Sequence, residues 1–211
     1  MSDPIVFGAS YSVYTRVVLL ALEEKGVPYR LQETDIFAAD GLPADYVERQ
    51  PFKRIPAFEH DGVRLYETSA ITRYIDEAFP GRSLMPEDLQ LWARANQIIS
   101  ILDSYAYRTW VWDIFVEGSD SDGEPDQAKI TAALPLAETC LAAIEDLMEG
   151  GDYFLGTTPT LADLHAAPMI ALLRAAPEGN DLLNGHVRWL EWWSRINDRP
   201  SMAATRFPRE G

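Results

Sequence analysis

The chain has 211 residues, of which 47% are hydrophobic and 24% are charged, a globular composition that excludes disordered and collagen-like chains. It carries 33 acidic and 18 basic residues, and the resulting formal net charge of −15 disfavours binding to nucleic acid or to an anionic membrane surface. The single cysteine, Cys140, excludes an intrachain disulfide and a thiolate metal cluster.

The first elements predicted along the chain are a strand, a helix and a second strand. Residues 5–7 are apolar and are followed by Gly8, which is typical of a short buried strand. Residues 12–25 carry apolar side chains at helical spacing, with a serine at the N-cap position and Gly26 at the C-cap position. Residues 29–34 alternate as a strand does. Two strands joined by a helix within about 30 residues predict a right-handed crossover and a parallel pair.

A β-hairpin and a further helix complete the first part of the chain. Residues 57–60 and 63–66 alternate around Asp61-Gly62, a dipeptide that suits the tight turn of a hairpin. The stretch before them is polar, with one short helix predicted at 44–48, and an apolar helix is predicted at 69–79. These elements predict a mixed four-stranded sheet, built in the order βαβ and then ββα.

The spacing of apolar residues changes from that of strands to that of helices near residue 85, which indicates a domain boundary. We therefore predict an α/β domain at residues 1–80, a linker at 81–88 and an all-helical domain at 89–211. The acidic segment 118–125 is predicted to be a surface loop. The helices predicted in the second domain span 89–116, 128–148, 160–175 and 187–197.

The turn between the first strand and the first helix is the first of three candidate binding motifs. A serine hydroxyl at a helix N-terminus can bind an anion that also faces the free N–H groups and the positive end of the helix dipole. Ser12 stands at this position. The alternative is that Ser12 only caps the helix, and the motif taken alone favours this alternative.

The second motif is Lys53-Arg54-Ile55-Pro56-Ala57. A cis peptide bond before Pro56 would turn the backbone of Ile55 outward to pair with an extended ligand, and the two cations would supply positive charge. The alternative is that Pro56 begins an edge strand through a trans bond and that both cations are solvated. Only about 5–6% of bonds before proline are cis, so the local sequence favours the alternative.

The third motif is Glu67-Thr68-Ser69, where a strand ends and a helix begins. A carboxylate beside a hydroxyl and helix N–H groups can hold both charges of an amino-acid zwitterion. Glu67 would bind the ammonium group and Thr68 the carboxylate. The alternative is capping of the helix by Thr68 or Ser69.

Together, the order and spacing of these motifs resemble those of a cytosolic glutathione transferase. The resemblance continues in the helical domain, where Thr160, Asp163 and Pro168 match the family's N-capping box and residues 187–200 resemble its late helix. Residues 12–16, Ser-Val-Tyr-Thr-Arg, are most similar to the serine-type active site. The chain is therefore identified as a serine-type, phi-like bacterial member of this family.

The resemblance implies a thioredoxin-like N-terminal domain, an all-helical C-terminal domain, a homodimer, and glutathione as cosubstrate with no metal. It also implies that the Ser12 hydroxyl donates a hydrogen bond to the glutathione sulfur. Ser10 is the alternative donor. A free thiol has a pKa of about 8.5, so ionisation at pH 7 requires a shift of about two units, or about 2.7 kcal/mol. A hydrogen bond to a charged group, about 1.5–3 kcal/mol, and a helix terminus, about 0.3–1 kcal/mol, nearly meet this requirement.

The same resemblance implies which residues bind the three parts of glutathione. Ile55 pairs through its backbone with the cysteinyl unit, ahead of a cis Pro56. Glu67 and Thr68 hold the γ-glutamyl end, although the family usually has serine where Thr68 stands. Phi members carry basic residues in the segment equivalent to 37–41, which is acidic and apolar here. The residues assigned to the glycyl carboxylate are Lys53 and Arg54.

The electrophilic second substrate is expected to be small and hydrophobic, and to bind between the two domains. The candidate lining residues are Tyr11, Tyr105, Tyr107, Trp110 and Val111. For these residues the alternative is packing in a core, because aromatic stripes on helices usually face one.

Two other functions remain open from the sequence: a noncatalytic binding module of the same fold, and a glutathione-dependent isomerase, lyase or dehalogenase. His60, His165 and His186 lack the spacing of metal ligands, so no metal is expected. No apolar stretch reaches about 18 residues and no export signal is recognisable, so a soluble cytoplasmic protein is expected.

Overall fold

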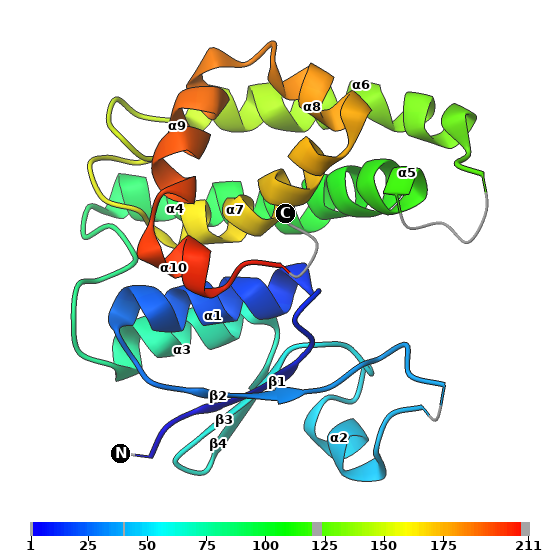
Figure 1. Ribbon diagram of the computed structural model, residues 1–211. Coiled ribbons are helices and arrows are strands. Elements are labelled where there is room, and N and C mark those ends of the chain that lie inside the picture. The colour runs from blue at the N-terminus through cyan, green and yellow to red at the C-terminus, as the bar shows by residue number, and fades with distance from the viewer. Residues whose placement is uncertain (1, 40, 120–123, 208–211) are drawn as a thin grey trace. The chain divides into compact units, whose positions relative to one another are not determined.

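The chain divides into two compact units. The residues that a computed structural model of the protein (Figure 1) describes are 2–39, 41–119 and 124–207. The first unit runs to Leu84 and also contains the chain from Pro200 on, and the second unit spans 85–199. The break after Leu84 lies within the predicted linker at 81–88. The chain after residue 199 differs from the prediction, because it belongs to the first unit and not to the helical second unit.

The first unit is built on a mixed sheet whose strand order is β2-β1-β3-β4. Its strands among the described residues are β1 (Ile5–Gly8), β2 (Arg30–Glu33), β3 (Ala57–His60) and β4 (Val63–Tyr66). β1 is parallel to β2 and antiparallel to β3, and β3 is antiparallel to β4, with Val6 opposite both Leu31 and Phe58. The predicted βαβ and ββα order is therefore confirmed.

Two helices of the first unit, α1 and α3, lie together on one face of its sheet (Figure 1). The helices of this unit among the described residues are α1 (Val13–Lys25), α2 (Ala44–Arg49), α3 (Thr68–Ala78) and α10 (Pro200–Ala204). As predicted, Ser12 caps α1 at its start and Gly26 ends it with a left-handed backbone, φ 65°. A Cβ on Gly8 would lie 2.3 Å from Thr15 Oγ1. The lack of a side chain at Gly8 therefore lets α1 approach β1 closely.

The second unit is helical throughout the part that the structure describes. Its helices are α4 (Leu89–Ile101), η1 (Leu102–Val116), α5 (Glu117–Ser119), α6 (Gln127–Leu147), α7 (Leu161–Ala175), α8 (Pro177–Leu183) and α9 (Val187–Asn197). The helix predicted at 89–116 is present, but its turns widen to π-helical geometry from Leu102 on. The predicted acidic loop at 118–125 lies partly outside the described residues. No helix among the residues described has the length and apolar character that crossing a membrane requires.

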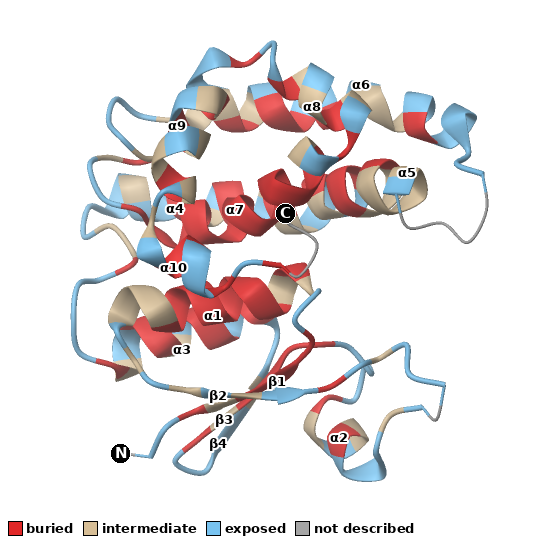
Figure 2. Ribbon diagram, viewed as in Figure 1, coloured by how far each residue is buried: buried red, intermediate tan, exposed pale blue. Residues whose placement is uncertain are grey.

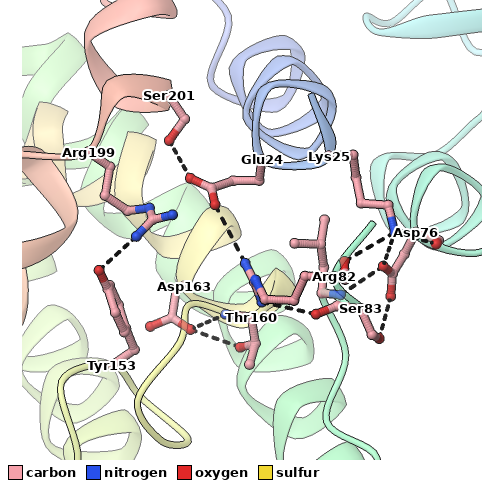
Figure 3. Close-up of polar contacts among 11 residues, drawn as sticks. Glu24, Lys25, Asp76, Arg82, Ser83, Tyr153, Thr160, Asp163, Arg199 and Ser201 are labelled. Carbon is pink, nitrogen blue, oxygen red and sulfur yellow. Dashed lines mark hydrogen bonds and ion pairs between the residues drawn. The ribbon is translucent and has the colours of Figure 1, made fainter. Parts of the chain in front are cut away.

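Helix α7 is the central element of the second unit, and Figure 2 shows it buried along almost its whole length. The predicted capping box at its start is confirmed. The Asp163 carboxylate accepts hydrogen bonds from the backbone N–H and the hydroxyl of Thr160, at 2.7 and 2.8 Å (Figure 3). It also accepts from the Phe154 N–H at 2.9 Å and the Trp192 indole at 2.8 Å. One buried carboxylate thus joins α7 to the preceding loop and to α9.

Aromatic rings fill the core beside α7. The Phe154 ring stacks on Trp192, with ring centroids 4.6 Å apart, and Trp189 packs edge-on against Trp110 at 5.9 Å. The Trp110 indole donates to the Ala137 carbonyl at 3.3 Å, which satisfies its polar atom inside the core.

His186, the N-cap residue of α9, joins that helix to α6 through its side chain. Its Nδ1 lies 2.6 Å from Glu145 Oε2 and its Nε2 lies 3.1 Å from Glu138 Oε2. Burial lowers the pKa of His186, but the hydrogen bonds to the two carboxylates outweigh it, and the net shift of the pKa is upward. The Arg188 guanidinium also faces this cluster and donates to the Glu145 carbonyl.

This cluster predicts that the protein loses stability as the pH rises above about 6.5. A raised folded-state pKa means that the stabilisation is complete below the unfolded-state pKa, about 6.5, and disappears as the pH rises through the higher folded-state pKa. We expect the free energy of unfolding in urea to fall over that range, and His186→Gln to flatten the dependence. A profile that keeps its slope in His186→Gln contradicts the prediction.

Candidate functional site

The N-terminal turn of α1 places Ser12 at the capping position. Its Oγ accepts a hydrogen bond from the Thr15 N–H at 3.3 Å, and its carbonyl accepts from the Arg16 N–H at 2.9 Å. The side chain is half-buried. A hydroxyl that accepts a hydrogen bond still has its own proton to donate. The capping interpretation of Ser12 and the anion-binding interpretation are therefore compatible.

Two acidic side chains at the end of β2 and just beyond it hold the turn that precedes Ser12. The Ser10 N–H donates to Glu33 Oε1 at 3.0 Å, and the Tyr11 hydroxyl donates to Asp35 Oδ1 at 2.6 Å. Burial and this hydrogen bond raise the pKa of Tyr11, and the same hydrogen bond lowers the pKa of Asp35. Sequence reasoning missed both acids, because a carboxylate near the end of an exposed strand is an ordinary surface residue.

The peptide bond between Ile55 and Pro56 is cis, and it lies directly before β3. Both side chains are buried, and Ile55 packs in a small core with Phe7 and Tyr46. In the part of the chain that the structure describes, the Ile55 N–H and carbonyl make no backbone hydrogen bond. The trans alternative for this motif is wrong.

Lys53 and Arg54 are exposed, and two polar side chains fix the loop that carries them. Gln50 is buried and accepts two hydrogen bonds from this loop. Its carbonyl accepts from the Lys53 N–H at 3.0 Å, and its side-chain oxygen accepts from the Arg54 N–H at 3.3 Å. The Tyr46 hydroxyl donates to the Arg54 carbonyl at 2.5 Å, and burial raises the pKa of Tyr46 to about 12. Neither anchor was predicted, because Tyr46 stands in a short helix, and Gln50 directly after it, within a polar stretch that carries no recognisable motif.

The Lys53 backbone lies in the left-handed region, with φ 56°, which favours glycine. A non-glycine residue with this backbone destabilises the folded state by about 1–2 kcal/mol. Glycine removes that strain, but it makes the unfolded chain more flexible, which costs about 0.5–1 kcal/mol of stability. We expect Lys53→Gly to raise the free energy of unfolding in urea by about 0.5–1 kcal/mol. The matched control, Arg54→Gly, replaces a neighbour that does not need positive φ and should lower it. Destabilisation by Lys53→Gly contradicts this account.

Glu67 stands at the junction of β4 and α3 with an unusual backbone, φ 69° and ψ 114°. It is the N-cap residue of α3, its side chain makes no capping bond, and its carbonyl accepts from the Ala70 and Ile71 N–H groups at 3.0 Å each. Thr68 is the first residue of the helix and is buried. Glu67 therefore occupies the N-cap position of α3, where the alternative for this motif placed Thr68 or Ser69. Positive φ at a non-glycine residue persists where the surrounding structure imposes it, often at a functional site.

Comparisons with known proteins identify the family. A model described as "Glutathione S-transferase, N-terminal domain" matches residues 6–83, and one described as "Glutathione S-transferase, C-terminal domain" matches residues 127–193. Glutathione S-transferase F6 of Arabidopsis thaliana is 30% identical over 206 residues, which cover 93% of this chain and 95% of the relative. The chain belongs to the glutathione S-transferase family.

Further likenesses extend over most of the molecule. Glutathione S-transferase hmp2 of Hypomyces subiculosus is 28% identical over 176 residues, 81% of this chain and 82% of the relative. The crystal structure of glutathione transferase F7 from Populus trichocarpa has a TM-score of 0.83 and 28% identity, and covers 96% of this chain and 97% of that one. The predicted thioredoxin-like domain followed by an all-helical domain is confirmed, and the chain is a transferase.

The residues predicted to line the electrophile pocket of this glutathione S-transferase differ in exposure. Tyr11 and Tyr105 are exposed, Tyr107 is half-buried and Val111 is buried. Trp110 is fully buried in the aromatic core of the second unit, so its assignment to the pocket is corrected in favour of core packing. For the other residues the pocket stays a prediction. Within the described residues, no cluster of three or more His, Cys, Asp and Glu side chains could hold a metal ion.

Proposed function

We propose that this glutathione S-transferase is a serine-type, phi-like enzyme in which Ser12 activates the glutathione thiol for attack on a small hydrophobic electrophile. The observation that carries the proposal is the Ser12 hydroxyl at the start of the 13-residue helix α1, where it accepts from Thr15 and keeps a proton to donate. Glutathione as the cosubstrate is supported by the relatives' names. A structure of the same fold, with a TM-score of 0.83 and 23% identity, holds lactoylglutathione.

The free energy needed to ionise the bound thiol is consistent with one hydroxyl at the end of a helix. A thiolate at pH 7 requires about 2.7 kcal/mol relative to free glutathione, whose thiol has a pKa near 8.5. A hydrogen bond to the charged sulfur contributes about 1.5–3 kcal/mol, and the dipole of α1 about 0.3–1 kcal/mol. Ionisation releases the thiol proton to solvent, and the thiolate then attacks an electrophilic carbon to form a carbon–sulfur bond. With an organic halide the halide departs with its electron pair, and with an isothiocyanate the nitrogen takes the electron pair and then a proton.

The remaining contacts with glutathione are proposed as the three motifs suggest. The cysteinyl unit pairs with the Ile55 backbone beside cis Pro56, which is supported by the lack of backbone hydrogen bonds at Ile55 among the described residues. Glu67 binds the γ-glutamyl ammonium group, and Thr68, at the start of α3, binds its carboxylate. The residues proposed for the glycyl carboxylate are Lys53 and Arg54, both exposed cations.

The experiment that tests the role of Ser12 is titration of bound glutathione by the ultraviolet absorbance of its thiolate. We expect the thiol pKa in the native complex to lie about two units below that of free glutathione. Ser12→Ala should raise it by about one to two units, since the hydroxyl contributes most of the shift. Ser10→Ala is the matched control and should leave it unchanged.

Each outcome of this titration has a distinct meaning. An unshifted thiol pKa in the native complex contradicts the proposed activation. A shift that survives Ser12→Ala and disappears in Ser10→Ala assigns the donor role to Ser10. Product formation with aryl halides, alkyl halides, isothiocyanates and peroxides then identifies the class of electrophile.

We also propose that the enzyme is a cytoplasmic homodimer. The exposed pair of Phe52 and Tyr66, whose rings meet edge to face at 6.0 Å, supports the dimer, because a partner subunit would remove this apolar surface from water. Sedimentation equilibrium measures the mass, and a species of 23.7 kDa at all concentrations contradicts the proposal.

A further inference from the structure

The chain returns to the first unit at its C-terminal end and packs along α1. Residues 200–207, which we call the C-terminal strap, comprise α10 and the turn that follows it, and α10 lies beside α1 (Figure 1). Four strap side chains are buried: those of Ser201, Met202, Thr205 and Phe207. The strap is therefore a packed part of the first unit.

Arg16, near the start of α1, contacts three residues of the strap. It is only 2% exposed, although arginine is rarely buried. Its Nε lies 3.4 Å from Thr205 Oγ1, and its Nη2 lies 3.3 Å from the Met202 carbonyl. The guanidinium also lies over the face of the Phe207 ring, 4.4 Å from its centroid. A buried cation must be compensated by hydrogen bonds or an aromatic face, and the strap supplies both to the guanidinium. These contacts therefore hold the Arg16 side chain in one position.

A second attachment joins the strap to the opposite end of α1. The Ser201 hydroxyl donates to Glu24 Oε1 at 2.6 Å, and Glu24 Oε2 lies 3.5 Å from Arg82 Nη2 (Figure 3). Arg16 and Glu24 are eight residues apart, about 12 Å along a helix. These polar contacts thus join the strap to α1 at two separate places, of which the one at Arg16 is near the start of the helix.

The Arg16 contact leads directly to Ser12. The Arg16 N–H donates to the Ser12 carbonyl at 2.9 Å, which closes the first turn of α1. On the other side of this turn, Thr15 packs tightly against Gly8 at the end of β1. The first turn of α1 is therefore held between the sheet on one side and the strap on the other.

We propose that Arg16 and Phe207 are positioning residues, through which the C-terminal strap fixes the first turn of α1 and hence the Ser12 hydroxyl. The catalytic part of this inference rests on the proposed function of Ser12. A hydrogen bond to a developing or stable anion depends steeply on donor distance and direction, so a small displacement of the turn weakens it. The bound thiol then ionises less readily, while the binding residues on other elements keep their geometry.

The first test measures the turn itself, without glutathione. Amide hydrogen exchange of the full chain should show the Arg16 N–H exchanging about tenfold faster in Phe207→Ala than in the native protein. Phe207→Tyr, which keeps an aromatic face, should restore the native rate. The matched control is Ser201→Ala, which releases the strap near Glu24 and should leave the Arg16 amide unchanged. Native exchange at Arg16 in Phe207→Ala overturns the proposal.

The second test measures the consequence for the thiol. In Phe207→Ala the pKa of the bound glutathione thiol should rise by about one unit and kcat near neutral pH should fall, while the Kd for glutathione changes by less than about twofold. Ser201→Ala should leave the thiol pKa at its native value.

If the strap has only a structural role, both variants should keep the native thiol pKa, and that result overturns the positioning role. If the thiol is unshifted in the native enzyme, the proposed function of Ser12 fails, and the exchange measurement still decides whether the strap orders the turn.

Discussion

Replacing Asp163 by alanine is expected to lower the free energy of unfolding by at least about 4 kcal/mol, a large part of the about 5–15 kcal/mol of a typical protein. The carboxylate is fully buried and accepts four hydrogen bonds. Its loss leaves the backbone N–H groups of Phe154 and Thr160 and the Trp192 indole N–H without acceptors inside a core, at about 1–3 kcal/mol for each donor.

Urea unfolding followed by tryptophan fluorescence measures this loss, since Trp192 is itself a partner of the carboxylate. Two further variants make the result specific. Thr160→Val removes one donor together with its need for an acceptor, so we expect a loss of about 1 kcal/mol. Asp181→Ala removes an exposed carboxylate from α8, and its effect should stay within about 0.5 kcal/mol. Equal effects of Asp163→Ala and Asp181→Ala contradict the account.

Much of the fold could be predicted because local signals and tertiary packing agree. In α1 the apolar spacing, the capping serine and Gly26 all indicate the same boundaries, and the structure has them. The hairpin predicted around Asp61-Gly62 is also present, as the antiparallel pair of β3 and β4. The short helices α8 and α10 were missed, because each begins at a proline and is too short to show a period. The widening of the helix at Leu102 was missed because apolar spacing does not separate α-helical from π-helical turns.

The candidate site was predictable where chemistry and position coincide in one motif. Ser12, Ile55 and Glu67 each stand at the junction of two elements, and such positions can be found from the sequence. The backbone of Lys53 could not be predicted, because a lysine gives no sign of a left-handed conformation. Arg16 gives no sign of burial either, since its contacts come from residues almost 190 positions later in the chain.

A second large effect is expected at a buried ion pair of the first unit, formed by Lys25 and Asp76. Both side chains are 2% exposed, and Lys25 Nζ lies 3.2 Å from Asp76 Oδ1 (Figure 3). The ammonium group also donates to the carbonyls of Asp76 and Arg82, at 2.9 and 3.1 Å, so all three of its protons have acceptors. The Asp76 carboxylate in turn accepts from the Leu84 N–H at 2.7 Å and the Ser83 hydroxyl at 3.2 Å. The pair thus joins residues 82–84, after which the chain leaves the first unit, to α1 and α3.

Asp76→Ala should lower the free energy of unfolding by about 3–5 kcal/mol, because it leaves the Lys25 charge buried without its carboxylate. Lys25→Met should lower it substantially for the converse reason. An exposed pair is the matched control: Asp45→Ala breaks the contact with Arg49 at 2.8 Å, where Asp45 is 70% exposed, and should cost at most about 1 kcal/mol.

The double variant Lys25→Met/Asp76→Ala separates charge burial from packing. Each single variant leaves one charge buried without its partner, whereas the double variant leaves none. If this penalty dominates, the double variant should lose about 1–3 kcal/mol less free energy of unfolding than the sum of the two single variants. If the two losses instead add, the side chains stabilise the unit independently through their own hydrogen bonds to the backbone. Urea unfolding of the four proteins at one pH gives this coupling energy directly, and an additive result contradicts the prediction.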